Sequence, residues 1–288
     1  MKWQNFLHFS DKKCSFTQNF ATQPLIFLFP KFLELFSTPK NTPPKPKNSK
    51  LDKSPIFFGT PCSSSFMMIK FYLLNQKMIK LQYCDCNRTI HIFPSENPKF
   101  ANTTCSRDAF QRGSNQKVIS FVFYGEFDSE KHKVRKYFEG IKTNLKQIRE
   151  LYGSTWIMRL YYDLVPADKQ VMTQLCDLAC VEPQLDLCNV RSLPGTPVED
   201  ASRMFAMNWR FFPTLDPQVD ILLSRDLDSR ISQREVDAVT EWMESGKLVH
   251  VMRDHPQHNT PMLGGMWATR MDIVDKINIR KEMKEYLV

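Results

Sequence analysis

Apolar positions change their spacing near residue 117, and from there two periods alternate along the chain. Residues 118–124 form a continuous apolar run closed by Gly125, which is typical of a strand buried on both faces. Residues 130–151 then carry apolar side chains, Tyr137 among them, at helical spacing. The pattern predicts a buried strand followed by a helix.

The same alternation continues to the C-terminal end of the sequence. Ser232 and Glu235 form a capping box that opens a helix, and Pro213 is expected to end an earlier one. The further strands are expected at residues 156–162, 185–190, 219–224 and 248–252, and the further helices at 167–179, 198–212, 233–245 and 272–286. Because strands and helices alternate, we expect an α/β fold with a mostly parallel sheet flanked by helices. Ligands bind such sheets beyond the carboxyl ends of the strands.

Residues 1–115 show neither period. Ten of the 18 prolines lie there, and residues 38–49 have the Pro/Lys composition of a linker. We expect residues 1–115 to be a low-order, largely disordered N-terminal segment. Residues 116–288 are expected to be the folded domain.

The net charge of +8 is concentrated in that first segment. Residues 1–115 hold 16 Lys and Arg against 6 Asp and Glu, whereas residues 116–288 hold 23 against 25. A nucleic-acid-binding domain carries positive charge on the folded surface that meets phosphate. We therefore expect no nucleic-acid partner. No run of about 20 apolar residues predicts a membrane span, and membrane association stays open.

The eight cysteines give no metal-site spacing. Cys84 and Cys86 form a C-x-C, but no second pair follows at zinc-ribbon spacing. Cys176 and Cys180 lie four residues apart on an expected helix, and we interpret them as small buried apolar residues rather than as a ligand pair. The redox compartment stays open. Residues 87–89 and 102–104 match the N-glycosylation sequon, which matters only on a secretory route.

Two carboxylates separated by one residue, Asp226 and Asp228, follow directly after the expected strand 219–224. A hard cation such as Mg²⁺ or Mn²⁺ takes one or two carboxylates together with phosphate oxygens of a substrate. Bound in this way, the ion neutralises a leaving diphosphate. Arg225 and Arg230 flank the pair; they can contact phosphate or form ion pairs with the two aspartates. The sequence therefore predicts a metal and diphosphate site at this strand end, with a solvated turn as the alternative.

A longer set of motifs extends this prediction. An R-D-L-D-S-R sequence at 225–230 is followed by M-R-D-H-P at 252–256 and by G-G-M-W at 264–267. The set resembles an uncharacterised group of nucleotide-sugar glycosyltransferases of the GT-A type. The resemblance covers roughly residues 117–270 and implies a GT-A-like fold.

The resemblance also implies roles for particular residues. Asp226 and Asp228 match the metal motif, with Asp228 as the direct ligand. Arg210 is similar to an arginine that lies over the donor sugar and diphosphate in many retaining GT-A enzymes, although a helix-surface charge is an alternative. Tyr124 and Gly125 look like the place for the nucleotide base. Five further residues are candidates for contacts with the donor or acceptor sugar, with structural roles as alternatives: Asp254, His255, Gly264, Gly265 and Trp267.

These residues lead to one preferred function and two alternatives. We expect transfer of a sugar from a nucleoside diphosphate sugar to a hydroxyl of a carbohydrate or glycoconjugate, with Mn²⁺ or Mg²⁺ as cofactor. No catalytic base can be named. A nucleotidyltransferase of similar fold and an inactive GT-A-like binding module are the alternatives. Many GT-A enzymes complete the metal site from a later segment, so we expect a domain incomplete at its C-terminus. The compartment would be the Golgi or secretory pathway in a eukaryote and the cytoplasm otherwise.

Overall fold

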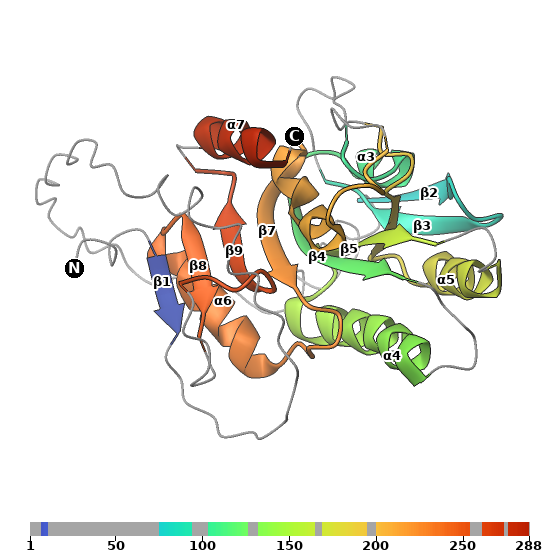
Figure 1. The fold of residues 1–288 in the computed structure, drawn as a ribbon, viewed down its shortest axis with the longest axis horizontal. Helices are drawn as coiled ribbons and strands as arrows, with labels where there is room; N and C mark the ends of the chain where they lie inside the picture. Colours follow the sequence, from blue (N-terminus) through green and yellow to red (C-terminus); the bar gives the residue numbers. More distant parts are fainter. Residues whose placement is uncertain are drawn as a thin grey trace, which may run out of the picture.

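The centre of the molecule is a sheet of seven strands (Figure 1). The structure, a computed structural model, describes residues 7–10, 75–93, 103–125, 132–164, 169–194, 200–253, 261–273 and 276–287. The strands of the sheet are β1 (Leu7–Ser10), β4 (Gln116–Tyr124), β5 (Trp156–Asp163), β6 (Leu185–Asn189), β7 (Val219–Arg225), β8 (Val249–Met252) and β9 (Met266–Arg270). Their order is β1-β8-β9-β7-β4-β5-β6.

The sheet is mostly parallel, as the sequence predicts. Only β9 runs against its neighbours, β7 and β8, and every other pair is parallel. The carboxyl ends of β4 to β8 therefore meet at one edge of the sheet, which we call the carboxyl edge. The amino end of β9 reaches the same edge. β9 was not expected as a strand, because the G-G-M-W motif was interpreted only as a source of contacts with a sugar.

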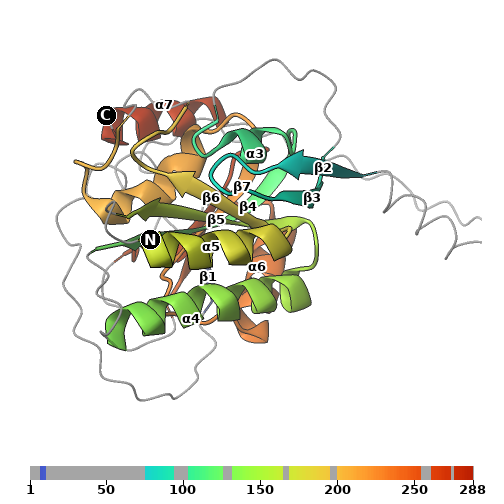
Figure 2. The same cartoon turned by 90° about the vertical axis from the view of Figure 1, so that its right-hand side faces the viewer.

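Helices cover both faces of the sheet (Figures 1 and 2). One face carries α4 (His132–Gln147), α5 (Lys169–Val181) and α6 (Gln233–Ser245), and the other carries α3 (Arg107–Phe110), the 3-10 helix η2 (Ala206–Leu215) and α7 (Lys276–Leu287). In β4, Ile119 and Phe121 pack with the first group, whereas Val118 and Val122 pack with the second. Burial on both faces explains why the parallel strands are continuous apolar runs. The predicted α/β architecture is confirmed.

One expected helix differs in kind. A helix over residues 198–212 was expected to stop before Pro213, but η2 begins at Ala206 and contains that proline. Residues 209–212 are all buried, so this segment lacks the outward polar stripe of an amphipathic α-helix. The tighter 3-10 form, common in short connectors, accommodates the buried run. This places Arg210 inside the molecule rather than on its surface.

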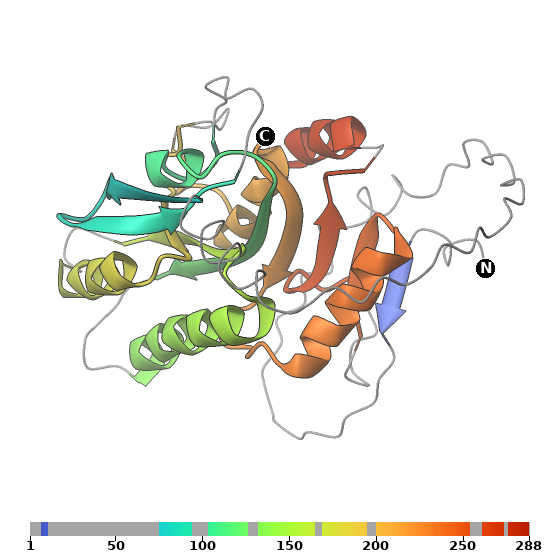
Figure 3. The same ribbon diagram turned by 180° about the vertical axis from the view of Figure 1, so that it is seen from behind.

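Part of the expected low-order segment is folded. Residues 75–93 form the hairpin of β2 (Gln76–Lys80) and β3 (Asn87–His91), and residues 103–115 include α3. Arg88 of β3 donates from Nη1 to the Ala179 carbonyl oxygen of α5 at 2.8 Å, and from Nη2 to Asp186 of β6 at 3.0 Å. The expected boundary at residue 116 was therefore wrong for these two stretches, which belong to the domain (Figure 3).

Three disulfides tie these stretches to the sheet and to α5. Cys84 is bonded to Cys176, Cys86 to Cys180, and Cys105 to Cys188. The interpretation of Cys176 and Cys180 as buried apolar thiols was wrong. Cys84 and Cys86 of the hairpin turn lie opposite Cys176 and Cys180, which share one face of α5, and each of the two forms a disulfide bond with one cysteine of the helix.

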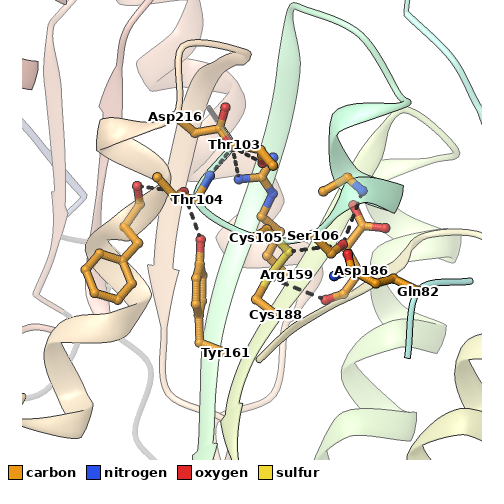
Figure 4. The surroundings of a disulfide bond; sticks show 12 residues. Gln82, Thr103, Thr104, Cys105, Ser106, Arg159, Tyr161, Asp186, Cys188 and Asp216 are labelled. Atoms are coloured by element: carbon orange, nitrogen blue, oxygen red, sulfur yellow. Dashed lines mark hydrogen bonds and ion pairs between the residues drawn. A yellow bond between two sulfur atoms is a disulfide. The ribbon is translucent and has the colours of Figure 1, made fainter. Parts of the chain in front are cut away.

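Two buried carboxylates lie near the third disulfide (Figure 4). Asp216 accepts hydrogen bonds from Thr103 Oγ1 and Arg159 Nη1, both at 2.7 Å. Burial alone would raise the pKa of Asp216, but the Arg159 guanidinium and the Thr103 hydroxyl hold it below its ordinary value. Asp186 is the second carboxylate, and Arg88 and Arg112 bind it. These ion pairs connect the N-terminal stretches to the sheet.

Candidate functional site

The strand order reverses beside β4. From β4 the chain continues to β5 and β6 on one side of the sheet, and then returns to β7 on the other side of β4. Ligands of open α/β sheets bind where the order reverses in this way. The carboxyl ends that flank the reversal are Tyr124 with Gly125 on β4, and Arg225 with Asp226 on β7. Both predicted groups therefore lie at the same switch point.

The carboxylate of Asp226 lies against the backbone of Gly265. Arg225 pairs with Met266 in the antiparallel β7–β9 register, so the residues just beyond them face each other. A Cβ atom on Gly265 would lie 2.0 Å from Asp226 Oδ2, a contact that no side chain could keep without moving the carboxylate. Ser224 Oγ donates to the Gly264 carbonyl oxygen at 2.6 Å and fixes this turn. The missing side chain of Gly265 therefore leaves room for the Asp226 carboxylate.

Arg210 of η2 forms an ion pair with the same Asp226 carboxylate. Its side chain is 1% exposed, and its Nη1 donates to Asp226 Oδ1 and, at 3.5 Å, to the Arg225 carbonyl oxygen. The guanidinium carbon lies 5.7 Å from the centre of the Phe211 ring. Arg210 Nε is buried and has no hydrogen-bond partner. The alternative of a helix-surface charge is excluded, and a buried cation lies directly at the carboxyl edge.

Asp228 follows the carboxyl end of β7 and contacts Lys136 of α4. Lys136 Nζ lies 3.5 Å from Asp228 Oδ2, and both side chains are partly exposed. Burial raises the pKa of Tyr137, and the nearby charge of Asp228 raises it further. The sequence pattern included Tyr137 among the apolar positions of this helix, but the residue is 36% exposed beside the carboxylates. Lys136 and Tyr137 are thus site residues that helical periodicity alone did not reveal.

Tyr124 adds a second partly exposed aromatic ring. Its side chain is 42% exposed, and its ring centre lies 5.6 Å from that of Trp209 in an edge-to-face arrangement. Burial raises its pKa, and of its two charged neighbours Arg210 lowers it and Asp226 raises it. Tyr124 and Tyr137 therefore offer two ring surfaces next to the acidic pair, a chemistry suited to a planar ligand group.

Three of the predicted site residues make internal contacts. The Arg225 guanidinium is buried, donates from Nε to Glu235 at 2.6 Å and binds internal carbonyl oxygens, so it stabilises the sheet–α6 contact. Trp267 is fully buried and packs against Phe211, which excludes it as a stacking surface. Arg230 donates to the Leu227 carbonyl oxygen at 3.0 Å and closes the loop after β7.

Asp254 and His255 lie outside the described residues. The strand that leads to them, β8, is parallel to β7, so Arg253 reaches the carboxyl edge. Across the described ranges, no group of three or more His, Cys, Asp or Glu side chains could hold a metal ion. The acidic pair at residues 226 and 228 would therefore need oxygen ligands from a substrate.

Two cavities in the described part of the chain lie away from the acidic pair. One of about 10 Å³ lies beneath the hairpin disulfides, and an open groove of about 450 Å³ lies between the π-helical turn η1 (Ile148–Tyr152) and α6. The groove is lined by apolar side chains such as Val236 and Met243. The first cavity is lined by Arg88 and Asp108, but neither cavity is lined by Asp226 or Asp228. The candidate site is therefore the carboxyl edge, where the two carboxylates lie.

Comparison with known proteins does not assign the chain. No family model matches it, and no curated protein is detectably similar to it.

The disulfides bear on the compartment. Disulfides persist in oxidising compartments and are rare where thiols are kept reduced. Three such bonds in one domain indicate an oxidising environment. Among the helices that the structure describes, none has the length and apolarity needed to cross a membrane.

We expect Asn87 to carry an N-linked glycan when the chain passes through a eukaryotic secretory pathway. Asn87 and Thr89 are both exposed on β3, and the intervening Arg88 points inward to Asp186. A sequon with this exposure is accessible to glycan. Secreted protein should lose mass on endoglycosidase treatment, and Asn87→Gln should remove the part of the shift that belongs to this site. An unchanged glycan mass in Asn87→Gln would contradict the prediction.

Proposed function

We propose that the carboxyl edge binds a divalent cation and the diphosphate of a nucleoside diphosphate sugar, and that the protein transfers the sugar to an acceptor hydroxyl. One observation carries the proposal. Asp226 and Asp228 lie together at the end of β7, beside the buried cation of Arg210, at the point where the strand order reverses. The motif resemblance names the reaction; the geometry supports binding of a metal–diphosphate group.

The acidic pair fits a hard cation held jointly with phosphate. Mg²⁺ and Mn²⁺ sites of this class use one or two carboxylates, several waters and phosphate oxygens rather than a full protein cage. Asp228, which is partly exposed, would be the direct ligand, and Asp226 would hold the ion or its water. Such an ion supplies charge neutralisation of the leaving diphosphate.

The protein's own groups bind and orient the donor. Arg210 fixes the Asp226 carboxylate and keeps a second positive charge beneath the diphosphate. Tyr124 and Tyr137, partly exposed beside the acidic pair, would offer ring faces to the base of the nucleotide. The carbohydrate or glycoconjugate acceptor would enter above the same edge.

The proposal is tested with a panel of nucleoside diphosphate sugars in the presence of Mn²⁺, following hydrolysis and transfer. Asp228→Ala should lower turnover at least about a hundredfold, because the charge stabilisation supplied by a metal is worth several kcal/mol. Asp228 is a better target than Asp226, since Asp226→Ala would leave the buried Arg210 without its counter-charge.

The matched control is Asp177→Ala, an exposed aspartate on α5. It should leave turnover unchanged. Both variants should keep the unfolding midpoint of the parent protein. The proposal fails if the parent protein neither binds nor turns over any nucleoside diphosphate sugar with Mn²⁺. Release of pyrophosphate from a nucleoside triphosphate would instead favour nucleotidyl transfer.

A further inference from the structure

Each carboxylate of the acidic pair already has a basic partner. Asp226 is paired with Arg210, and Asp228 is paired with Lys136 at 3.5 Å. The four side chains together carry no formal net charge. A divalent cation that binds the two carboxylates must therefore compete with positive charge that the protein itself supplies.

The two partners differ in how readily they can leave. The Arg210 side chain is 1% exposed and also binds the Arg225 carbonyl oxygen. The Lys136 side chain is 44% exposed and that of Asp228 is 31% exposed. An exposed ion pair of this kind contributes little after screening and the loss of side-chain entropy. Lys136 is therefore the partner that a dication can displace.

We propose that Lys136 is a resident counter-cation of Asp228 that a divalent ion displaces, and that its ammonium group then binds the phosphate of the incoming ligand. The phosphate part of this inference rests on the proposed function. Lysine suits the role because its ammonium is a compact charge on a flexible stem with three rotatable donors. While it is paired with Asp228, Lys136 Nζ lies 5.8 Å from the ring centre of Tyr137, its neighbour on α4.

The exchange has a thermodynamic consequence. Metal alone is opposed by Lys136, whereas metal that arrives with phosphate gives Lys136 a new partner. Binding of the two ligands is therefore coupled, and linkage requires the coupling to be reciprocal. Removing the ammonium group should strengthen binding of the metal alone and weaken binding of the metal–phosphate complex. Opposite changes in these two affinities are the expected signature of the exchange.

The test uses Mn²⁺ alone, followed by the spin-resonance signal of the free ion, and a preformed Mn²⁺–pyrophosphate complex, followed by calorimetry. Lys136→Met should tighten Mn²⁺ binding by up to about fivefold, the equivalent of an exposed ion pair. It should weaken binding of the complex about tenfold, the equivalent of one charge-assisted hydrogen bond. Lys136→Arg should restore binding of the complex.

The control is Lys142→Met, an exposed lysine of the same helix that pairs with Glu139. It removes the same formal charge and should change both affinities far less. The inference is overturned if Lys136→Met leaves Mn²⁺ affinity unchanged or lowers it, or if Lys142→Met has equal effects. Both ligands in this test are inorganic, so the test does not depend on sugar transfer. If Lys136→Met shifts the two affinities in opposite directions but the protein transfers no sugar, only the proposed function is overturned.

Discussion

Loss of both hairpin disulfides should cost far more stability than loss of either one. The bonds Cys84–Cys176 and Cys86–Cys180 close nearly the same loop, with separations of 92 and 94 residues. In the chain-entropy model a loop of this length is worth about 4–5 kcal/mol, but a second bond beside the first closes only a ring of a few residues, worth about 2 kcal/mol. The two bonds are therefore partly redundant.

The experiment measures urea unfolding of three variants. One double variant combines Cys86→Ser and Cys180→Ser, a second combines Cys84→Ser and Cys176→Ser, and a fourfold variant carries all four substitutions. Each double variant should lose about 2 kcal/mol, and the fourfold variant about 6–7 kcal/mol. That second loss is comparable to the whole stability of many domains, so the fourfold variant should be largely unfolded at ambient temperature. Cys14 and Cys62 are replaced by serine throughout to prevent exchange. Losses that simply double from the twofold to the fourfold variant would contradict the nested-loop argument.

The fold could be predicted from sequence where burial leaves a clear pattern. Strands such as β4 and β7 are apolar runs because both faces are covered, and α6 matches its prediction at both ends because Ser232 and Gly246 cap it. β9 was missed because it is short and its glycine-led motif resembles a loop. The hairpin at residues 76–91 was missed because its attachment depends on disulfide pairing, which cannot be deduced from cysteine positions alone.

The candidate site was predictable only in part. Asp226 and Asp228 follow a recognisable strand, so their place at the carboxyl edge could be inferred. Contacts between residues of different elements could not be inferred from the sequence. Gly265 meets Asp226 only because β9 runs antiparallel to β7. Helical spacing grouped Tyr137 with the apolar positions of α4, because the period does not show which turn of the helix lies over the sheet and which lies at its edge.

Asp186→Asn should destabilise the protein by about 3–5 kcal/mol, because breaking a buried pair leaves its partners as uncompensated buried charges. The carboxylate is fully buried and accepts hydrogen bonds from Arg112 Nε and Nη2, both at 2.8 Å, and from Arg88 Nη2 at 3.0 Å. Burial lowers the pKa of Arg88 to about 10, so its charge persists at neutral pH. The asparagine keeps the shape of the site but removes the charge that two guanidinium groups share.

The pH dependence of unfolding separates this electrostatic cause from a packing defect. Burial alone would raise the pKa of Asp186, but Arg112 and Arg88 hold it below its ordinary value of 3.8. A lowered native pKa gives stability that is complete above the unfolded pKa and is lost as the pH falls from there toward the native pKa. The free energy of unfolding should therefore fall below about pH 5 in the parent protein, and less steeply in Asp186→Asn. Asp85→Asn, at an exposed pair with Lys80, is the control and should follow the parent curve. Equal slopes in the parent and Asp186→Asn would show that the carboxylate does not stabilise the fold through its charge.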